Sequence, residues 1–289
     1  MGDVREREVE RLERVPGMGG AFARAMVPSR SKRVLLPERA VTVGGVRQDA
    51  DRLAEYARVC GFTLRDDVPP TWLHVLTFPL HIHLLGSSES TVKLAGAVHT
   101  SNTMTLHRPV TAADVLELSV HLEGPRPHRR GALVDLVGVI RVDGEVAWDG
   151  VTTYLASGAR ADGEPQRAER EPFEPRTPHA RWRLPGDLGR QYRRVSGDPN
   201  PIHTSRLAAR AFGFPRPIIH GMWSHARALA ALESRLPPSY SAHVDFVKPI
   251  ALPSTVGFVT SEADGAITAD VVSRDGAKPH LRMRVEGRS

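Results

Sequence analysis

The feature that most constrains the fold of this chain is an internal repeat. Glu55–Phe62 reads EYARVCGF, and Gln191–Asp198 reads QYRRVSGD, at an offset of 136 residues. A second pair of similar stretches, around Pro109 and Pro249, is offset by 140 residues. Two matches at nearly the same offset predict two copies of one structural unit, one of which has degenerated.

Composition predicts where the two copies divide. Residues 158–181 carry many charges and four prolines, with Phe173 as their only large apolar side chain, which is typical of a linker. A chain of 289 residues has room for two domains of ordinary size. We therefore expect an N-terminal degenerate repeat over residues 1–157, a linker over 158–181 and a C-terminal repeat over 182–289.

Each repeat shows the same predicted order of secondary structure. A polar-flanked helix precedes a longer apolar helix, and segments typical of strands follow. The pairs Asp143-Gly144 and Asp275-Gly276 are expected hairpin turns. A long helix followed by an antiparallel meander, twice, predicts an α+β fold, with the helix across the concave face of the sheet. The expected helices are Asp49–Cys60, Trp72–Leu85 with an interruption at Pro79, Pro185–Val195 and Gly221–Leu236. The expected strands are Ala97–Leu106, Val115–Leu122, Leu133–Val142, Val146–Leu155, Ser241–Val247, Thr255–Thr260, Ala266–Ser273 and His280–Val285.

Composition also excludes several classes of protein. The single cysteine, Cys60, excludes an intrachain disulfide and a cysteine-based zinc cluster. The first residues carry charges of both signs, unlike a secretion signal, and no apolar stretch is long enough to span a bilayer. We therefore expect a cytoplasmic protein that does not enter a membrane.

The basic character of the chain comes almost entirely from arginine. The net charge is +6, and the 39 basic residues include only four lysines, which leaves 35 arginines. Guanidinium groups bind phosphate in a bidentate manner, so nucleic acid and phosphorylated small ligands are both candidate partners. The arginines are scattered and aromatic residues make up only 6% of the chain, whereas nucleic-acid surfaces cluster basic and aromatic side chains. We therefore expect no nucleic-acid partner.

The most informative segment is Ser196–His203, which reads SGDPNPIH. Its glycine and two prolines predict a tight, rigid turn. That turn holds Asp198 and His203 five residues apart, and the side chain of Asn200 can bond the turn backbone. A carboxylate and an imidazole held together can share one water molecule, one taking a proton while the other gives one. A plain turn with a structural histidine is the alternative.

A second element runs from a proline-stiffened loop into the long helix that begins at Gly221. A glycine at the start of a helix leaves its backbone N–H open to an incoming group, and the helix dipole favours negative charge there. Such a position can form an oxyanion hole without any side chain. A glycine selected for close packing is the alternative.

Together the two elements resemble the signature of the MaoC-like dehydratases, also called (R)-specific enoyl-CoA hydratases or hydratase 2. That signature is an aromatic residue, then Gly-Asp-x-Asn-Pro-aliphatic-His, and a His-Gly-Met at the start of the central helix. Residues 192–209 fill the first part, and His220, Gly221 and Met222 fill the second. Members with two such halves resemble a double hotdog fold, in which each central helix is wrapped by an antiparallel sheet.

The resemblance implies reversible hydration of a trans-2-enoyl thioester to a (3R)-3-hydroxyacyl thioester in fatty-acid metabolism, without a cofactor. The expected catalytic residues are Asp198 and His203, which would handle the protons of the catalytic water, and Gly221, whose amide would bind the thioester oxygen. Which of the two side chains activates the water stays open. The expected substrate-binding residues are Asn200, His220, Met222, Trp72 and Leu76.

The first repeat departs from this signature, because Phe62 stands where the second repeat has Asp198. We therefore expect one active site per chain. The degenerate repeat would take the acyl chain along the helix that carries Trp72 and Leu76, unless these residues are plain core. No metal site is expected.

Two other functions stay open at this point: a hotdog acyl-thioesterase, and a non-catalytic acyl-thioester binding protein. The expected partner is a thioester of coenzyme A or of an acyl carrier protein. Since one chain would do what two single-hotdog subunits do together, assembly into a homodimer is optional.

Overall fold

The computed structural model describes residues 7–27, 31–165 and 172–288, which form two compact units. Unit 1 contains residues 7–27, 31–47, 76–99 and 113–165, and unit 2 contains residues 48–75, 100–112 and 172–288. Unit 2 therefore includes two segments of the N-terminal half, residues 48–75 and 100–112, whereas the expected repeats are continuous stretches. The division at 157 and 182 stays a prediction, and residues 166–171 of the expected linker lie outside the described residues.

Unit 1 is built on strands in the order β1-β2-β4-β5-β6, in which β1 and β2 run parallel and the other neighbours antiparallel. Buried and partly exposed residues alternate along β4 and β5, because only one face of the sheet packs on a core. Asp143 and Gly144 both have positive φ, 53° and 82°, so the expected hairpin turn is confirmed. The elements are β1 (Val9–Leu12), α1 (Met18–Met26), β2 (Ala40–Val46), the second part of α3 (Pro70–Leu85), β4 (Leu116–His128), β5 (Gly131–Val142) and β6 (Glu145–Ser157).

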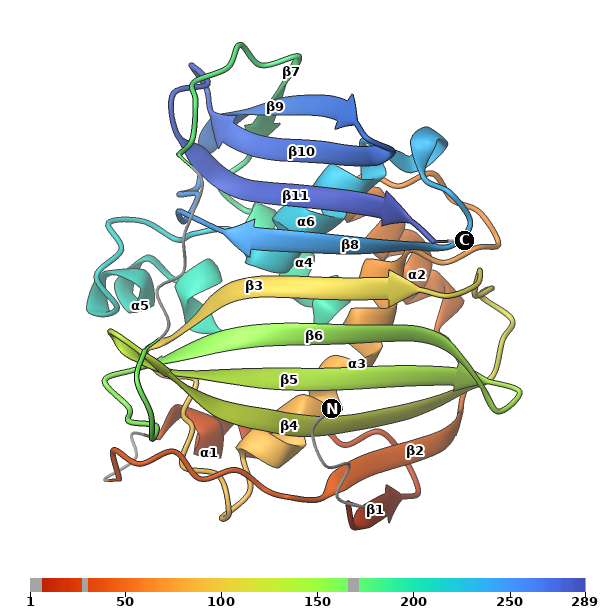
Figure 1. Cartoon of the computed structure of the whole chain (residues 1–289), viewed down its shortest axis with the longest axis vertical. Coiled ribbons are helices and arrows are strands. Elements are labelled where there is room, and N and C mark those ends of the chain that lie inside the picture. The colour runs from red at the N-terminus through yellow and green to blue at the C-terminus, as the bar shows by residue number, and fades with distance from the viewer. Residues whose placement is uncertain (1–6, 28–30, 166–171, 289) are drawn as a thin grey trace. The chain divides into compact units, whose positions relative to one another are not determined.

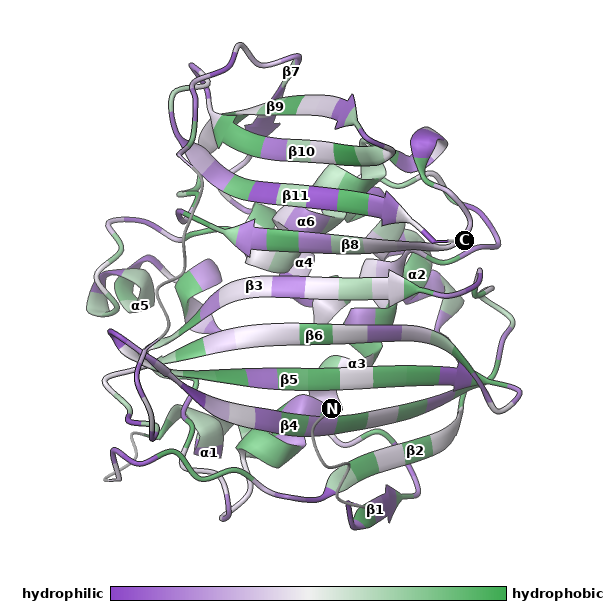
Figure 2. Ribbon diagram, in the orientation of Figure 1, coloured by the Kyte–Doolittle hydropathy of each residue, from purple (hydrophilic) through white to green (hydrophobic). Residues whose placement is uncertain are grey.

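Unit 2 holds antiparallel strands in the order β3-β8-β11-β10-β9-β7 (Figure 1). Hydrophobic and hydrophilic residues alternate along its strands, as β11 shows in Figure 2. The elements are α2 (Ala50–Cys60), the first turns of α3, β3 (Ala97–Leu106, from Thr100 on), β7 (Ala180–Leu184), α4 (Leu188–Ser196), the 3₁₀ turn η1 (Pro201–His203), α5 (Arg206–Ala211), α6 (Gly221–Ala230), the 3₁₀ turn η2 (Glu233–Arg235), β8 (Tyr240–Phe246), β9 (Ser254–Ala263), β10 (Ala266–Ser273) and β11 (Pro279–Gly287).

Helix α6 packs on β10 and β11 and is buried along most of its length. The sequence predicts this helix over Gly221–Leu236, but it ends at Ala230. Two prolines follow Leu236, which is extended (φ −75°, ψ 134°), and a residue before proline avoids the helical region. The intervening residues form the short turn η2 instead of a further helical turn.

Helices α2 and α4 show that the internal repeat is structural. Each ends at a left-handed glycine, Gly61 (φ 81°) and Gly197 (φ 76°), whose N–H closes the last turn. Their equivalent tyrosines, Tyr56 and Tyr192, lie against each other with ring centroids 6.1 Å apart. In both repeats the helices precede antiparallel strands, so the predicted α+β class is confirmed.

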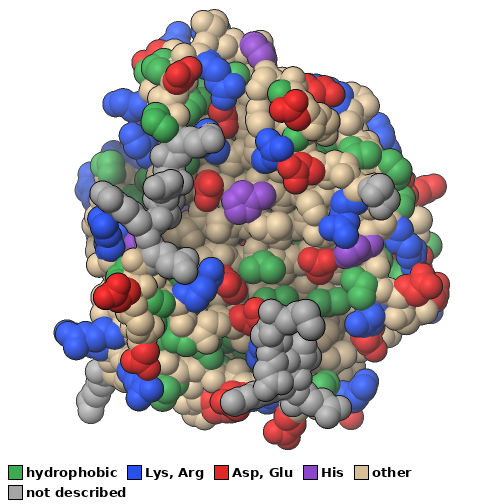
Figure 3. Space-filling model, in the orientation of Figure 1, with side chains coloured by type: hydrophobic (Ala, Val, Ile, Leu, Met, Phe, Trp, Pro, Cys, Tyr) green, Lys and Arg blue, Asp and Glu red, His purple; other side chains and the backbone are tan. Residues whose placement is uncertain are grey.

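The surface carries charges of both signs. Figure 3 shows lysines and arginines interspersed with acidic residues over the visible face. None of the helices within the described ranges combines the length and the apolar character needed to cross a membrane.

Candidate active site

The predicted catalytic turn connects α4 to α5. Gly197 ends α4, and the hydroxyl of Ser196 accepts a hydrogen bond from the N–H of Asp198 (3.2 Å). The Oδ1 atom of Asp198 accepts from the N–H of Asn200 (2.9 Å), whose own Oδ1 accepts from the N–H of Ile202 (3.3 Å). These successive side-chain-to-backbone bonds fix the turn, and within the described part of the chain no backbone N–H donates to Oδ2 of Asp198.

The loop before α6 is pinned to this turn through Ile218. The N–H of Ile218 donates to the carbonyl of Ile202 (3.3 Å), and its own carbonyl accepts from Nδ1 of His203 (2.8 Å). The next residue, Ile219, donates to the carbonyl of Ile250 (2.9 Å). The start of α6 is therefore held beside the turn by backbone bonds rather than by side-chain packing alone.

Asp198, His203 and His220 form one cluster at this point. A polar side-chain atom from each lies within 4.8 Å of the other two. The imidazole rings of His203 and His220 stack with centroids 3.7 Å apart and planes inclined by 26°. Nε2 of His220 lies 3.8 Å from Oδ2 of Asp198, whose side chain is 23% exposed. Solvent therefore reaches the carboxylate at one edge of an otherwise buried cluster.

The burial of His203 sets its protonation state. Burial lowers its pKa from the ordinary 6.5, although the nearby Asp198 carboxylate and the bond to Ile218 act in the opposite direction. Because a carbonyl can only accept, Nδ1 of the neutral ring carries the hydrogen. Nε2 is therefore left with a free lone pair, which is what a general base needs.

His220 is an unusual polar group in this cluster. Its side chain is 3% exposed, and neither ring nitrogen has a hydrogen-bond partner among the described residues. Its faces are covered by His203 and by Tyr192, whose ring centroid is 4.9 Å away. Burial, followed by the effects of His203 and Arg193, keeps its pKa well below the ordinary value. A buried polar group without a partner calls for a ligand or a water molecule.

Gly221 is the first residue of α6, where the backbone N–H has no acceptor within the helix. A Cβ at this position would lie 2.9 Å from Cε1 of Phe246. A side chain here would therefore force Phe246 to shift, and the same position presents a backbone amide without an acceptor in the helix. Met222, which follows, is 8% exposed and contributes mainly to the core.

The structure buries Trp72 more deeply than the sequence indicates. Its side chain is fully buried, its Nε1 donates to Gln48 (3.0 Å), and its ring packs on Tyr56 at 5.4 Å. It is the first of a continuous row of ring contacts through Tyr56, Tyr192 and His220 to His203. Leu76 lies in the second part of α3, in unit 1, and is partly exposed.

Sequence reasoning missed two supporting residues. A Cβ on Gly189 in α4 would lie 2.0 Å from the carbonyl oxygen of His203, so this glycine lets α4 approach the catalytic turn. The sequence feature that could have pointed to Gly189 is a glycine inside a helical pattern. Nothing in the sequence could have indicated the role of the Ile218 carbonyl, because every residue type supplies a backbone carbonyl.

The cluster also offers three groups that can ligate a metal, Asp198, His203 and His220. The lone pairs of imidazole lie in the ring plane, and the planes of the two rings are only 26° apart. An ion between the two stacked rings would therefore lie outside the plane of at least one of them, where that ring has no lone pair to offer. The geometry therefore favours acid–base chemistry over metal ligation.

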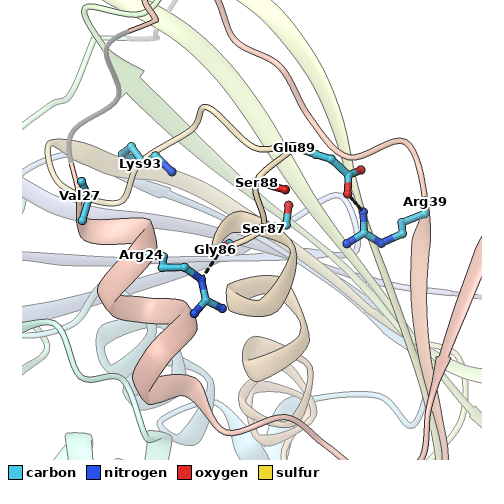
Figure 4. A pocket seen from close by; sticks show the side chains of 8 residues that line it. All are labelled: Arg24, Val27, Arg39, Gly86, Ser87, Ser88, Glu89 and Lys93. Carbon is cyan, nitrogen blue, oxygen red and sulfur yellow. Dashed lines mark hydrogen bonds and ion pairs between the residues drawn. The ribbon is translucent and has the colours of Figure 1, made fainter.

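A cavity of about 700 Å³ lies in unit 1, between the end of α1 and the end of α3 (Figure 4). Its cations already have partners. Arg39 bonds Glu10 (2.7 Å) and Glu89, Arg24 donates to the carbonyl of Gly86 (2.9 Å), and Lys93 donates to that of Ser90 (3.3 Å). No histidine lines this cavity, so it lacks the acid–base pair of the cluster.

Comparison with known proteins places this cluster in a family context. The family model described as "MaoC like domain" matches residues 169–280. The Mycobacterium tuberculosis protein "3-hydroxyacyl-thioester dehydratase X" is 40% identical over 255 residues, which is 87% of this chain and 90% of that protein.

Solved structures show the same likeness. The crystal structure of HtdX of M. tuberculosis aligns with a TM-score of 0.78 at 37% identity, over 86% of this chain and 100% of that one. A further M. tuberculosis protein, described as having a double hotdog fold, aligns with a TM-score of 0.51 at 13% identity over 93% of this chain and 98% of its own. The predicted double hotdog fold is therefore confirmed.

Proposed function

This chain belongs to the family of MaoC-like dehydratases, and on that premise we propose that it catalyses the reversible hydration of a trans-2-enoyl thioester to a (3R)-3-hydroxyacyl thioester. The observation that carries the proposal is the neutral His203, whose Nδ1 is fixed on Ile218 and whose Nε2 lone pair is free, in one cluster with Asp198. Such a pair can take a proton from water and return it.

In the hydration direction, Nε2 of His203 takes a proton from a water molecule as the water oxygen forms a bond to C3 of the enoyl group. The Asp198 carboxylate accepts the second hydrogen bond of the water and stabilises the imidazolium that forms. The proton is then delivered to C2, so water has been added across the double bond. Dehydration is the same sequence in reverse. This assigns the activation of water to His203.

Addition at C3 places negative charge on the thioester oxygen until C2 is protonated. The N–H of Gly221 meets that charge at the positive end of the helix dipole of α6. Asn200 supports the turn through its Oδ1, and its amide N–H groups are available to the water. His220 would bind the water or substrate at the cluster through its unpartnered ring nitrogens.

The acyl chain is proposed to follow α3 past Trp72 and Leu76. Trp72 supports this direction because its ring belongs to the row of contacts that reaches His203. Its complete burial supports the alternative of a plain core residue. We also propose that the protein is cytoplasmic, that it acts in fatty-acid metabolism and that it needs no cofactor.

The test is hydration of a trans-2-enoyl-CoA, followed by the loss of enoyl absorbance and by chiral analysis of the product. We expect the 3R product, and we expect Asp198→Asn and His203→Gln each to lower kcat by ~10²–10⁴-fold. Asp187→Asn, at the other end of α4, is the control and keeps its activity. Release of free thiol would indicate a thioesterase, and binding without turnover would indicate a carrier-binding protein.

A further inference from the structure

The surface formed by α5 and the loop after it is not used by the reaction described above. Leu207 is 81% exposed, more than any other large hydrophobic side chain within the described residues, and Phe212 is 40% exposed. Arg206, Arg210 and Arg216, from the same segment, are also exposed. These five residues are called the α5 surface below, and in Figure 1 α5 lies at the left edge.

The arginines of the α5 surface lack acidic partners. Neither Arg206 nor Arg210 makes an ion pair or side-chain hydrogen bond with a described residue, and Arg216 donates only to the carbonyl of Pro253 (3.3 Å). From Pro199 to Leu232 the sequence contains no aspartate or glutamate. Arg126, by contrast, is paired with Asp135 (2.7 Å). The α5 surface therefore combines two exposed apolar side chains with three arginines that have no acidic partner among the described residues.

This surface is fixed to the catalytic turn. The N–H of Ser205, the N-cap of α5, donates to the carbonyl of Pro201 in η1 (2.8 Å), and its hydroxyl accepts from Ala208 (3.2 Å). Ala209 is fully buried beneath the surface, and its carbonyl accepts from Phe214 (2.9 Å). A partner bound at the α5 surface would therefore be held at a defined position relative to His203.

We propose that the α5 surface docks an acidic helical carrier protein that presents the acyl group on its phosphopantetheine arm. This inference rests on the proposed function, because it concerns which thioester the same site receives. Positive charges steer acidic partners, and exposed apolar side chains supply contact area that is buried in the complex. The phosphates of coenzyme A would use the arginines but give no role to an almost fully exposed leucine.

The test compares two substrates with the same acyl group, trans-2-octenoyl-CoA and a bacterial acyl carrier protein loaded with trans-2-octenoate. In the double variant Arg206→Glu/Arg210→Glu, we expect kcat/KM for the carrier-protein substrate to fall about tenfold or more and to lose its salt dependence. In Leu207→Ala it falls several-fold. The value for octenoyl-CoA stays unchanged in both, because the catalytic turn is intact.

The matched control is Arg183→Glu/Arg274→Glu, which changes the net charge equally at exposed sites on β7 and after β10. We expect this control to leave kcat/KM unchanged for both substrates. Equal losses with both substrates, or no loss with the carrier protein, would overturn the proposal. If the wild type hydrated neither substrate, the proposed function would fail. The affinity of the loaded carrier protein for the wild type and for the same variants, measured by calorimetry, would then still test whether the carrier protein docks on the α5 surface.

Discussion

The ring of His203 lies on the ring of His220, with centroids 3.7 Å apart. Burial lowers the pKa of both imidazoles, and each would repel a charge on the other. Of these two rings, only that of His203 has its Nδ1 bonded to a backbone carbonyl. The pair is therefore neutral at rest, and the hydrogen of His203 is fixed on Nδ1, which leaves Nε2 of His203 with the lone pair that a base needs.

The pH dependence of the reaction follows from the pKa of His203. The neutral ring is the active form in hydration, so activity is lost as pH falls and the ring takes a proton. Because burial lowers the pKa below the ordinary 6.5, we expect the acid limb of the kcat profile to lie below pH 6.5. A profile measured with saturating enoyl-CoA checks this, and an acid limb above pH 7 would contradict it.

Gly189 is expected to be essential for the position of the catalytic turn. In Gly189→Ala the new Cβ would meet the carbonyl of His203 at 2.0 Å, so α4 and η1 must move apart. Overpacking of this kind costs ~1–3 kcal/mol of unfolding free energy, and kcat falls with it. The control is Gly186→Ala, whose nearest atom would be 3.7 Å away. Thermal unfolding and kcat are measured for both, and equal behaviour would disprove the packing argument.

The role of the Gly221 amide can be isolated by two substitutions. Gly221→Ala and Gly221→Pro both place a Cβ against Phe246, but only proline removes the N–H. Proline is tolerated at the first position of a helix, and His220 already has the extended conformation that precedes proline (φ −60°, ψ 136°). We expect kcat to be ~10²-fold lower in the proline variant than in the alanine variant. Equal kcat values would exclude an oxyanion role.

The proposed path of the acyl chain predicts an effect on chain-length preference. In Leu76→Trp the larger ring would fill the space along α3, so kcat/KM for long enoyl-CoA substrates falls while that for short ones is kept. Each methylene that can no longer be buried costs ~0.8 kcal/mol. Leu64→Trp, at a position 68% exposed, is the control. An unchanged preference in a folded Leu76→Trp variant would place the chain elsewhere.

We expect the buried His81 to make the folded protein less stable in acid. Its ring is buried and its Nε2 donates to the carbonyl of Val137 (3.0 Å), and burial lowers its pKa from 6.5 to about 4. The unfolded chain takes this proton below pH 6.5, whereas the folded protein takes it only near pH 4. Unfolding free energy therefore falls across this window, by about 3 kcal/mol from this group.

The measurement is denaturant unfolding of the wild type and of His81→Gln between pH 7 and pH 4. Glutamine can still donate to Val137 but does not titrate in this range. The variant should lose less stability on acidification, because His203 and His220 contribute equally to both proteins. Parallel curves would show that His81 is protonated in the folded state at higher pH than its burial implies.

Much of the fold was predictable because its signals are local. The alternation of residues along β4 and β5, the turn at Asp143-Gly144 and the glycine that ends each of α2 and α4 are all set by neighbours in the sequence. Proline and glycine in Ser196–His203 likewise predict the turn that holds Asp198. The end of α6 was predicted wrongly, because apolar periodicity continues past Ala230 while the backbone already turns.

By itself, the sequence determined the two repeats, the turn with Asp198 and His203, and the glycine that opens α6, because residue type and spacing alone dictate such short-range geometry. The tertiary structure alone decided the stacking of His203 on His220, the bond from His203 to Ile218 and the contact of Gly189 with the catalytic turn. It also decided that Leu207 faces solvent. These properties arise where separate segments meet, and the free energy of such contacts depends on packing and burial that no local pattern encodes.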